Sequence, residues 1–123
     1  SQGVAKHLGE LFWDWGIPTA ASLCELKNLA FTIIASGGIR NGLDIAKAIA
    51  LGATVVGIAL PFLKEYAKAG LPAVETYIDY LIKGLRMAMV LTGCRNLVEL
   101  QQQKLVITGK LRDWLISRKL PLP

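Results

Sequence analysis

The sequence predicts an α/β fold in which parallel strands alternate with helices. Two short segments, 31–35 and 54–59, are apolar and rich in β-branched residues, as in strands buried on both faces of a parallel sheet. The segment 42–51, which lies between them, has the pattern of a helix with one apolar side. Strand–helix–strand units of this kind form parallel sheets with right-handed crossovers.

Helices are also expected on both sides of this unit. Apolar residues recur at helical spacing over 2–15, and we expect Gly16 to end that helix in the left-handed conformation. We expect the side chain of Thr19 to cap a second helix, 20–28. After the second strand, a short helix ends near residue 68. The remaining segments are a loop over 69–72, a long helix over 73–92, a short helix over 96–101, an extended piece over 106–109 and a last helix over 111–118.

Two parallel strands cannot close a barrel or bury every one of these helices. We therefore expect neighbouring strands to lie outside this chain. The composition is that of an ordered domain, because 53% of the 123 residues are hydrophobic and only 19% are charged.

Charge and hydropathy exclude two classes of partner. The net charge of +5 is scattered along the chain, so a solvated polar face is preferred over nucleic-acid binding. The longest apolar run, 51–63, is shorter than the roughly 20 residues that cross a bilayer. No signal-peptide pattern is present at the start of the sequence. We expect a soluble, cytoplasmic protein with no nucleic-acid or membrane partner.

Histidine and cysteine usage excludes a zinc site of the usual kind from this chain. His7 is the single histidine, and the two cysteines, Cys24 and Cys94, are far apart in the sequence. We expect Cys24 to be a buried free thiol, as in a reducing compartment. Cys94 is not a convincing nucleophile, because no histidine follows it.

The turn after the first strand predicts a phosphate-binding site. Gly37 and Gly38 let the backbone approach a ligand closely, and Arg40 is a forked donor suited to phosphate oxygens. The helix that follows, starting near Gly42, is expected to offer unpaired amides to an anion. The second strand ends at 59–61 and again opens a helix. Barrels frequently bind phosphate between two such neighbouring loops.

Several other residues have a functional and a structural interpretation. Asp44 is a possible metal ligand or base, but we prefer a first-turn acid that favours the helix dipole. Trp13, Trp15 and Trp114 are possible stacking platforms, but each sits in a helical pattern and is interpreted as a packing residue. Arg86 is a possible ligand contact, although a surface ion pair is the commoner role.

Residues 35–53 resemble the FMN-phosphate segment of flavin-type (β/α)8 barrels. This group includes 2-hydroxy-acid oxidases, glutamate synthases and the flavin-free IMP-dehydrogenase-like barrels. Those relatives usually carry an aspartate before the two glycines, where this chain has Ser36. Three further parts resemble the type 2 isopentenyl diphosphate isomerases, with the last the most specific. These parts are 11–19, 59–63, and 85–94 together with 106–114.

The resemblance covers essentially the whole chain. It implies that 1–123 is the C-terminal part of one TIM (β/α)8-barrel domain, roughly its last helix–strand–helix–strand–helix units, with no second domain. The full-length protein would interconvert isopentenyl and dimethylallyl diphosphate by a flavin-assisted 1,3-proton shift. It would use FMN, NADPH and Mg²⁺ and assemble as a tetramer or larger homo-oligomer.

The resemblance also assigns residues, all of them to FMN binding. The residues that match the two phosphate loops are Gly37, Gly38, Ile39 and Arg40 in the first and Ala59 and Leu60 in the second. Family residues that bind the diphosphate, the metal and the isoalloxazine ring lie outside this chain. We therefore assign no catalytic and no metal residue here, and we expect the fragment alone to be inactive.

Two alternatives remain open from the sequence. One is an FMN-dependent 2-hydroxy-acid oxidase, which would need a catalytic histidine and arginine at the end of the strand before Phe31, a region that this chain does not show. Ser36 and the block 106–114 disfavour it. The other is a non-catalytic half-barrel that associates with itself through exposed strand edges.

Overall fold

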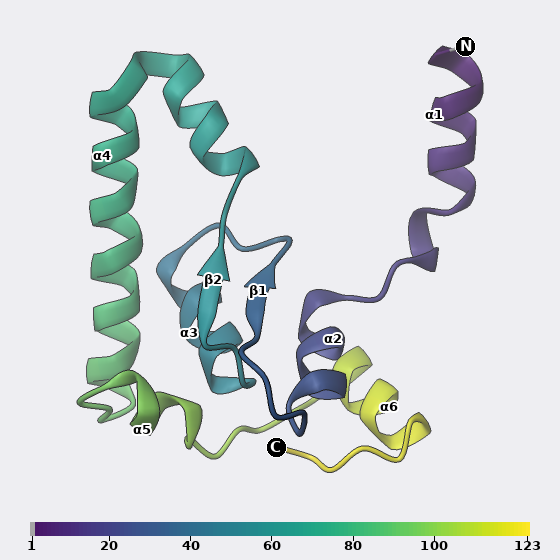
Figure 1. Ribbon diagram of the computed structural model, residues 1–123, viewed down its shortest axis with the longest axis vertical. Coiled ribbons are helices and arrows are strands. Elements are labelled where there is room, and N and C mark those ends of the chain that lie inside the picture. The colour runs from purple at the N-terminus through teal and green to yellow at the C-terminus, as the bar shows by residue number, and fades with distance from the viewer. Residues whose placement is uncertain (1) are drawn as a thin grey trace.

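The computed structural model describes residues 2–123, which form helices around a small parallel sheet (Figure 1). The elements are α1 (Gln2–Leu11), η1 (Trp13–Trp15), α2 (Thr19–Leu26), β1 (Ile34–Ser36), α3 (Gly42–Ala50), β2 (Val55–Gly57), α4 (Leu60–Leu91), α5 (Leu97–Gln101) and α6 (Gly109–Ser117). Their order confirms the expected alternation of strands and helices.

The sheet consists of β1 and β2, which pair in parallel through the α3 crossover. Ile34 lies opposite Val55, and Ser36 lies opposite Gly57. Both strands therefore end at the same edge of the sheet. The loops that follow them, which carry the expected phosphate site, lie side by side at this edge.

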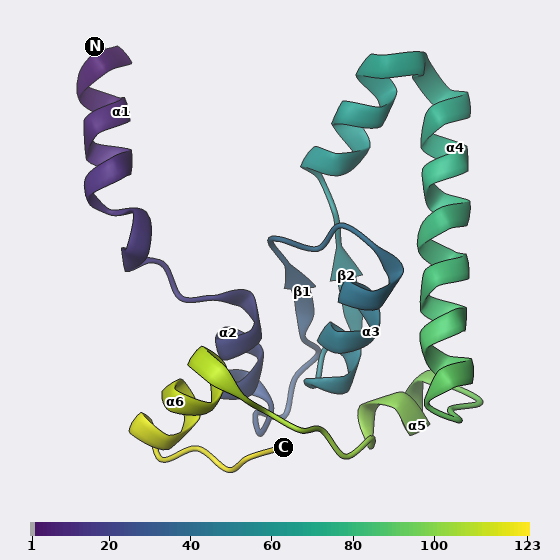
Figure 2. The same cartoon turned by 180° about the vertical axis from the view of Figure 1, so that it is seen from behind.

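The expectation that both strands are buried on both faces is wrong for this chain. Ala35 is 2% exposed, but its neighbour Ile34 is 66% exposed and Val55 is 50% exposed. The reason is that side chains alternate across a strand, and α3 covers only one face of the sheet (Figure 2). The apolar side chains of the other face have no partner among residues 2–123.

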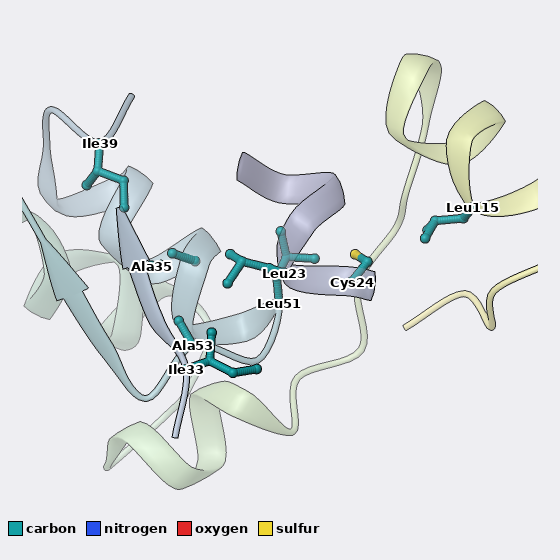
Figure 3. Packing of buried hydrophobic residues seen from close by; sticks show 9 residues of the cluster. Leu23, Cys24, Ile33, Ala35, Ile39, Leu51, Ala53 and Leu115 are labelled. Carbon is teal, nitrogen blue, oxygen red and sulfur yellow. The ribbon is translucent and has the colours of Figure 1, made fainter. Parts of the chain in front are cut away.

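The covered face carries the larger hydrophobic core. Figure 3 shows Ile33, Ala35, Leu51 and Ala53 gathered with Leu23 of α2. Cys24 extends this core toward α6, where Leu115 is fully buried. The core thus packs α2 and α6 against the sheet.

Helix α4 bends back on itself, as Figures 1 and 2 both show. Ala69 and Gly70 have non-helical backbone angles inside it, and Gly70 has a positive φ of 68°. The bend occupies the position of the loop expected over 69–72. Gly93 follows the helix with a φ of 71°, in the left-handed region where glycine is favoured.

The segment before α2 differs from expectation at two positions. Gly16 is extended, with φ −69° and ψ 146°, because a 3-10 turn ends the helical bonding at Trp15 and the chain then runs extended into Pro18. Thr19 does not cap α2, since Pro18 is the N-cap residue and no side chain caps this helix.

Helix α1 projects away from the rest of the chain and contains no buried residue. Its apolar side chains, and those of Trp13 and Trp15, are exposed. Trp15 packs edge-on against Phe12, with 5.8 Å between ring centroids, but neither tryptophan joins a core formed by residues 2–123. Trp114 of α6 does pack, and its Nε1 donates to Oε1 of Glu25 at 3.0 Å. Within the described part of the chain, no helix has the length and apolarity needed to cross a bilayer.

Candidate anion-binding site

A cavity of about 390 Å³ lies between the loop after β1 and the start of α4. Its position follows from the sheet, because the two loops leave neighbouring parallel strands at the same edge. The residues that line it are Gly38, Ile39, Arg40, Leu60, Pro61, Lys64, Glu65, Lys68 and Tyr77. Both loops predicted from the sequence therefore contribute to one cavity.

The glycine turn presents its backbone to this cavity. Gly37 and Gly38 have φ values of 99° and 73°, which residues with a side chain rarely adopt. A Cβ atom on Gly38 would meet no atom within 4 Å, so the space beside it is open. Among the loop hydrogen bonds of residues 2–123, none uses the N–H groups of 37–39 as donors. These amides are available to a ligand.

Two side chains at the start of α3 accept backbone N–H groups there. The Asn41 side chain accepts the N–H of Asp44 at 2.8 Å, and Oδ2 of Asp44 accepts the N–H of Arg40 at 3.1 Å. Of the first-turn amides of α3, the capping asparagine therefore uses that of Asp44, while those of Gly42 and Leu43 donate in no hydrogen bond of the described chain. The expectation that this helix offers unpaired amides to an anion is thus wrong for Asp44 alone. Asp44 has the structural role that we preferred.

Helix α4 offers the better anion-binding end. No side chain caps its N-terminus, and Ala59 occupies the N-cap position. Pro61 in the first turn lacks an N–H, whereas the other first-turn amides have no acceptor within the helix. The positive end of the helix dipole adds to the attraction for an anion at this point.

Basic side chains surround the same space. Arg40, Lys64 and Lys68 line the cavity with one carboxylate, Glu65, which pairs with Lys68 at 3.0 Å. No ion pair in the described chain involves Arg40 or Lys64. The cavity therefore combines open backbone donors with an excess of positive charge, which is the chemistry that binds a phosphate group.

Tyr77, in the part of α4 after the bend, contacts the glycine turn. Its hydroxyl donates to the carbonyl oxygen of Arg40 at 2.7 Å, and its ring packs edge-on against Phe62 with 5.2 Å between centroids. Burial raises the pKa of Tyr77, and the charge of nearby Glu65 raises it further, so the hydroxyl keeps its proton. Nothing in the sequence pattern predicts this contact.

Thr19 contacts the turn from another side. Its hydroxyl lies 2.9 Å from the carbonyl oxygen of Gly37 and 3.3 Å from that of Ser36. The sequence analysis assigned this hydroxyl to a helix cap, because threonine commonly has that role before a helix. Only the path of the chain in space could show that the turn lies beside it.

The six residues assigned from the sequence lie together, in differing roles. Gly38, Arg40 and Leu60 line the cavity directly. Ile39 also lines it, although only 6% of this residue is exposed and it belongs to the hydrophobic core. Gly37 and Ala59 flank the cavity on the two loops.

Other candidate groups lie elsewhere. Cys24 and Cys94 are buried free thiols, and burial raises the pKa of Cys24. Within residues 2–123, no three His, Cys, Asp or Glu side chains are grouped so that they could hold a metal ion. Arg86 is exposed on α4 and does not line the cavity.

The profile of the FMN-dependent dehydrogenase family matches residues 13–107. The chain belongs to this family. It is 51% identical over 114 residues to an isopentenyl-diphosphate delta-isomerase of Methanothermobacter thermautotrophicus, covering 92% of this chain and 32% of that protein. It is 48% identical over 119 residues to the isomerase of Pyrococcus abyssi, covering 94% and 32%. The chain thus spans about a third of the length of these curated relatives.

Solved structures of flavoproteins share the fold. A mandelate oxidase variant with the monooxide FMN adduct is 30% identical, with a TM-score of 0.73 over 77% of this chain and 31% of that one. A flavocytochrome b2 variant is 25% identical, with a TM-score of 0.60 over 81% of this chain and 30% of that one. These neighbours are TIM-barrel flavoproteins. Together with the family match, they confirm that this chain is part of a (β/α)8 barrel.

Proposed function

We propose that this chain is the C-terminal, FMN-phosphate-binding part of a type 2 isopentenyl-diphosphate isomerase. The observation that carries the proposal is the basic cavity between the glycine turn and the uncapped start of α4. The relatives that match nearly all of the chain at 51% and 48% identity are named isopentenyl-diphosphate delta-isomerase, which supports this activity over others in the flavin family.

The residues of the cavity fit the phosphate end of FMN. The N–H groups of Gly37 and Gly38 and those of the first turn of α4 would donate to phosphate oxygens. Arg40 would form a charge-assisted contact, and Lys64 would add charge neutralisation at longer range. Ala59 and Leu60, in the second loop, would contact the same phosphate group. Bound in reduced form, FMN would supply the acid–base chemistry of a 1,3-proton shift without net redox change.

This part of the barrel would hold the cofactor by its phosphate and contribute no proton-transferring group. The residues for the diphosphate, for Mg²⁺ and for the isoalloxazine ring would come from the rest of the same barrel domain. NADPH would keep the flavin reduced. We further propose a cytoplasmic homo-oligomer, a tetramer or larger, with 1–123 forming no second domain.

The test is an activity assay on the full-length protein. Isopentenyl diphosphate, FMN, NADPH and Mg²⁺ are supplied under anaerobic conditions, and dimethylallyl diphosphate is the expected product. The matched assay supplies a 2-hydroxy acid such as mandelate with oxygen, because solved mandelate oxidases share the fold. Oxidation of the hydroxy acid without isomerisation would contradict the proposal and favour the oxidase alternative.

A further inference from the structure

The Gly37–Gly38 peptide unit needs an external support to keep one orientation. Neither residue has a Cβ atom, so the backbone on both sides of this peptide rotates more freely than elsewhere. The side chain that contacts its carbonyl is that of Thr19, at 2.9 Å. The same hydroxyl lies 3.3 Å from the carbonyl oxygen of Ser36, one peptide earlier.

Peptide geometry connects these contacts to the N–H groups of the turn. Every peptide bond in the described chain is trans. In a trans unit, the carbonyl of one residue and the N–H of the next point in opposite directions. A hydroxyl that holds the Gly37 carbonyl toward Thr19 therefore directs the N–H of Gly38 away from Thr19. The contact with Ser36 acts in the same way on the N–H of Gly37.

The turn separates two cavities, and Thr19 lies in the one without the basic cluster. Thr19 and Gly37 line a cavity of about 190 Å³ behind the turn. Arg40 and Leu60 line the basic cavity of about 390 Å³ in front of it. Gly38 lines both, so its peptide unit forms part of the wall between them.

We propose that Thr19 is a positioning residue for the phosphate site: its hydroxyl fixes the carbonyls of Ser36 and Gly37 so that the amides of the two glycines face the basic cavity. The inference rests on the proposed function, because it assigns those amides to the FMN phosphate. It adds a residue from α2, outside both phosphate loops. It also predicts that loss of the Thr19 hydroxyl weakens binding of the FMN phosphate and leaves binding of the flavin ring unchanged.

The test compares FMN with riboflavin, which lacks the phosphate, on the full-length apoprotein. Thr19→Val keeps the shape of the side chain and removes the hydroxyl. We expect the Kd for FMN to rise about fivefold, the effect of one lost neutral hydrogen bond. The Kd for riboflavin is expected to stay the same. Thr19→Ser, which keeps the hydroxyl, should retain most of the FMN affinity.

Thr76→Val is the matched control. The Thr76 hydroxyl donates to the carbonyl of Pro72 at 2.9 Å, in α4 and away from the turn, so its loss should change neither Kd. Thr19→Ala provides a second variant without the hydroxyl if Thr19→Val does not fold, and thermal melting checks the fold of each.

The outcomes separate the two levels of the proposal. Equal losses of FMN and riboflavin affinity in Thr19→Val would overturn the positioning role and indicate a general structural one. An unchanged preference for FMN in Thr19→Val, alongside a lost preference in Arg40→Ala, would overturn the role of Thr19 alone. A wild-type protein that binds riboflavin as tightly as FMN would contradict the phosphate site itself.

Discussion

Gly42 and Gly84 pack backbone against backbone, which holds the start of α3 directly on α4. A Cβ atom on Gly84 would come within 3.0 Å of the Gly42 Cα, and one on Gly42 would overlap backbone atoms of Gly84 and Leu85. Since α3 begins just behind the glycine turn, this contact fixes the base of the phosphate site relative to the helix that lines its other side.

We predict that Gly42→Ala destabilises the protein by about 2–3 kcal/mol, because the added methyl group meets backbone that cannot move aside. Denaturant unfolding of the full-length protein measures the change. Gly9→Ala is the control, since a Cβ at Gly9 meets nothing within 4 Å and alanine favours the helix. Equal stabilities of Gly42→Ala and wild type would show that the two helices are not this closely packed.

Arg40→Ala is predicted to weaken FMN binding in the full-length protein by about tenfold, since a charged hydrogen bond to phosphate is lost. Riboflavin affinity should be unaffected. Arg86→Ala is the control, because Arg86 is another exposed arginine and does not line the cavity. Fluorescence titration measures both constants, and unchanged FMN affinity in Arg40→Ala would refute the assignment of this residue.

Tyr77→Phe is predicted to weaken FMN binding about fivefold, because the 2.7 Å hydrogen bond to the Arg40 carbonyl disappears while the ring and its packing on Phe62 remain. Tyr80→Phe removes a neighbouring hydroxyl from an exposed ring that stacks on Tyr77 and should have no effect. If the two variants bind FMN alike, the hydroxyl of Tyr77 does not support the turn.

Acid is predicted to loosen α6 through Glu25. Hydrogen bonds from Arg118 at 2.7 Å and from Trp114 at 3.0 Å hold the pKa of Glu25 below its ordinary value. A carboxylate whose pKa is lowered by folding stabilises the folded state above its unfolded pKa. That contribution disappears as the pH falls through the lowered value, below about pH 4.

Hydrogen exchange of the α6 amides measures this loosening. In wild type, protection of 109–117 should fall as the pH drops through the pKa of Glu25, after correction for intrinsic exchange. Glu25→Gln should show lower protection at neutral pH and little further change in acid. A wild-type profile that does not depend on pH in this range would contradict the role of Glu25.

The strand–helix–strand unit could be predicted from sequence because its determinants are local. Apolar runs rich in β-branched residues specify β1 and β2, and a one-sided apolar pattern specifies α3. Gly70 lies at the bend of α4, and Gly93 follows its end. Burial could not be predicted in the same way. Ile34 and Val55 lie in segments whose apolar composition is typical of buried strands. Their side chains are nevertheless exposed, because no residue among 2–123 covers them.

The backbone of the site was predictable, and its supports were not. Gly38 and Arg40 follow from the pattern of a glycine turn after a strand, and Leu60 from the second loop. The contacts of Thr19 and Tyr77 depend on how distant segments cross in space, and a hydroxyl near a helix start is equally suited to capping. The contacts of Asn41 and Asp44 at the start of α3 also required the hydrogen bonds themselves.

The central claim is that the two loops hold the phosphate of FMN, and a crystal structure of the full-length protein with FMN tests it most directly. We predict phosphate oxygens within about 3.2 Å of the backbone nitrogens of Gly38 and Leu60, with the Arg40 side chain in contact. A phosphate bound away from both loops, with the cavity between the turn and α4 filled only by solvent, would contradict the claim.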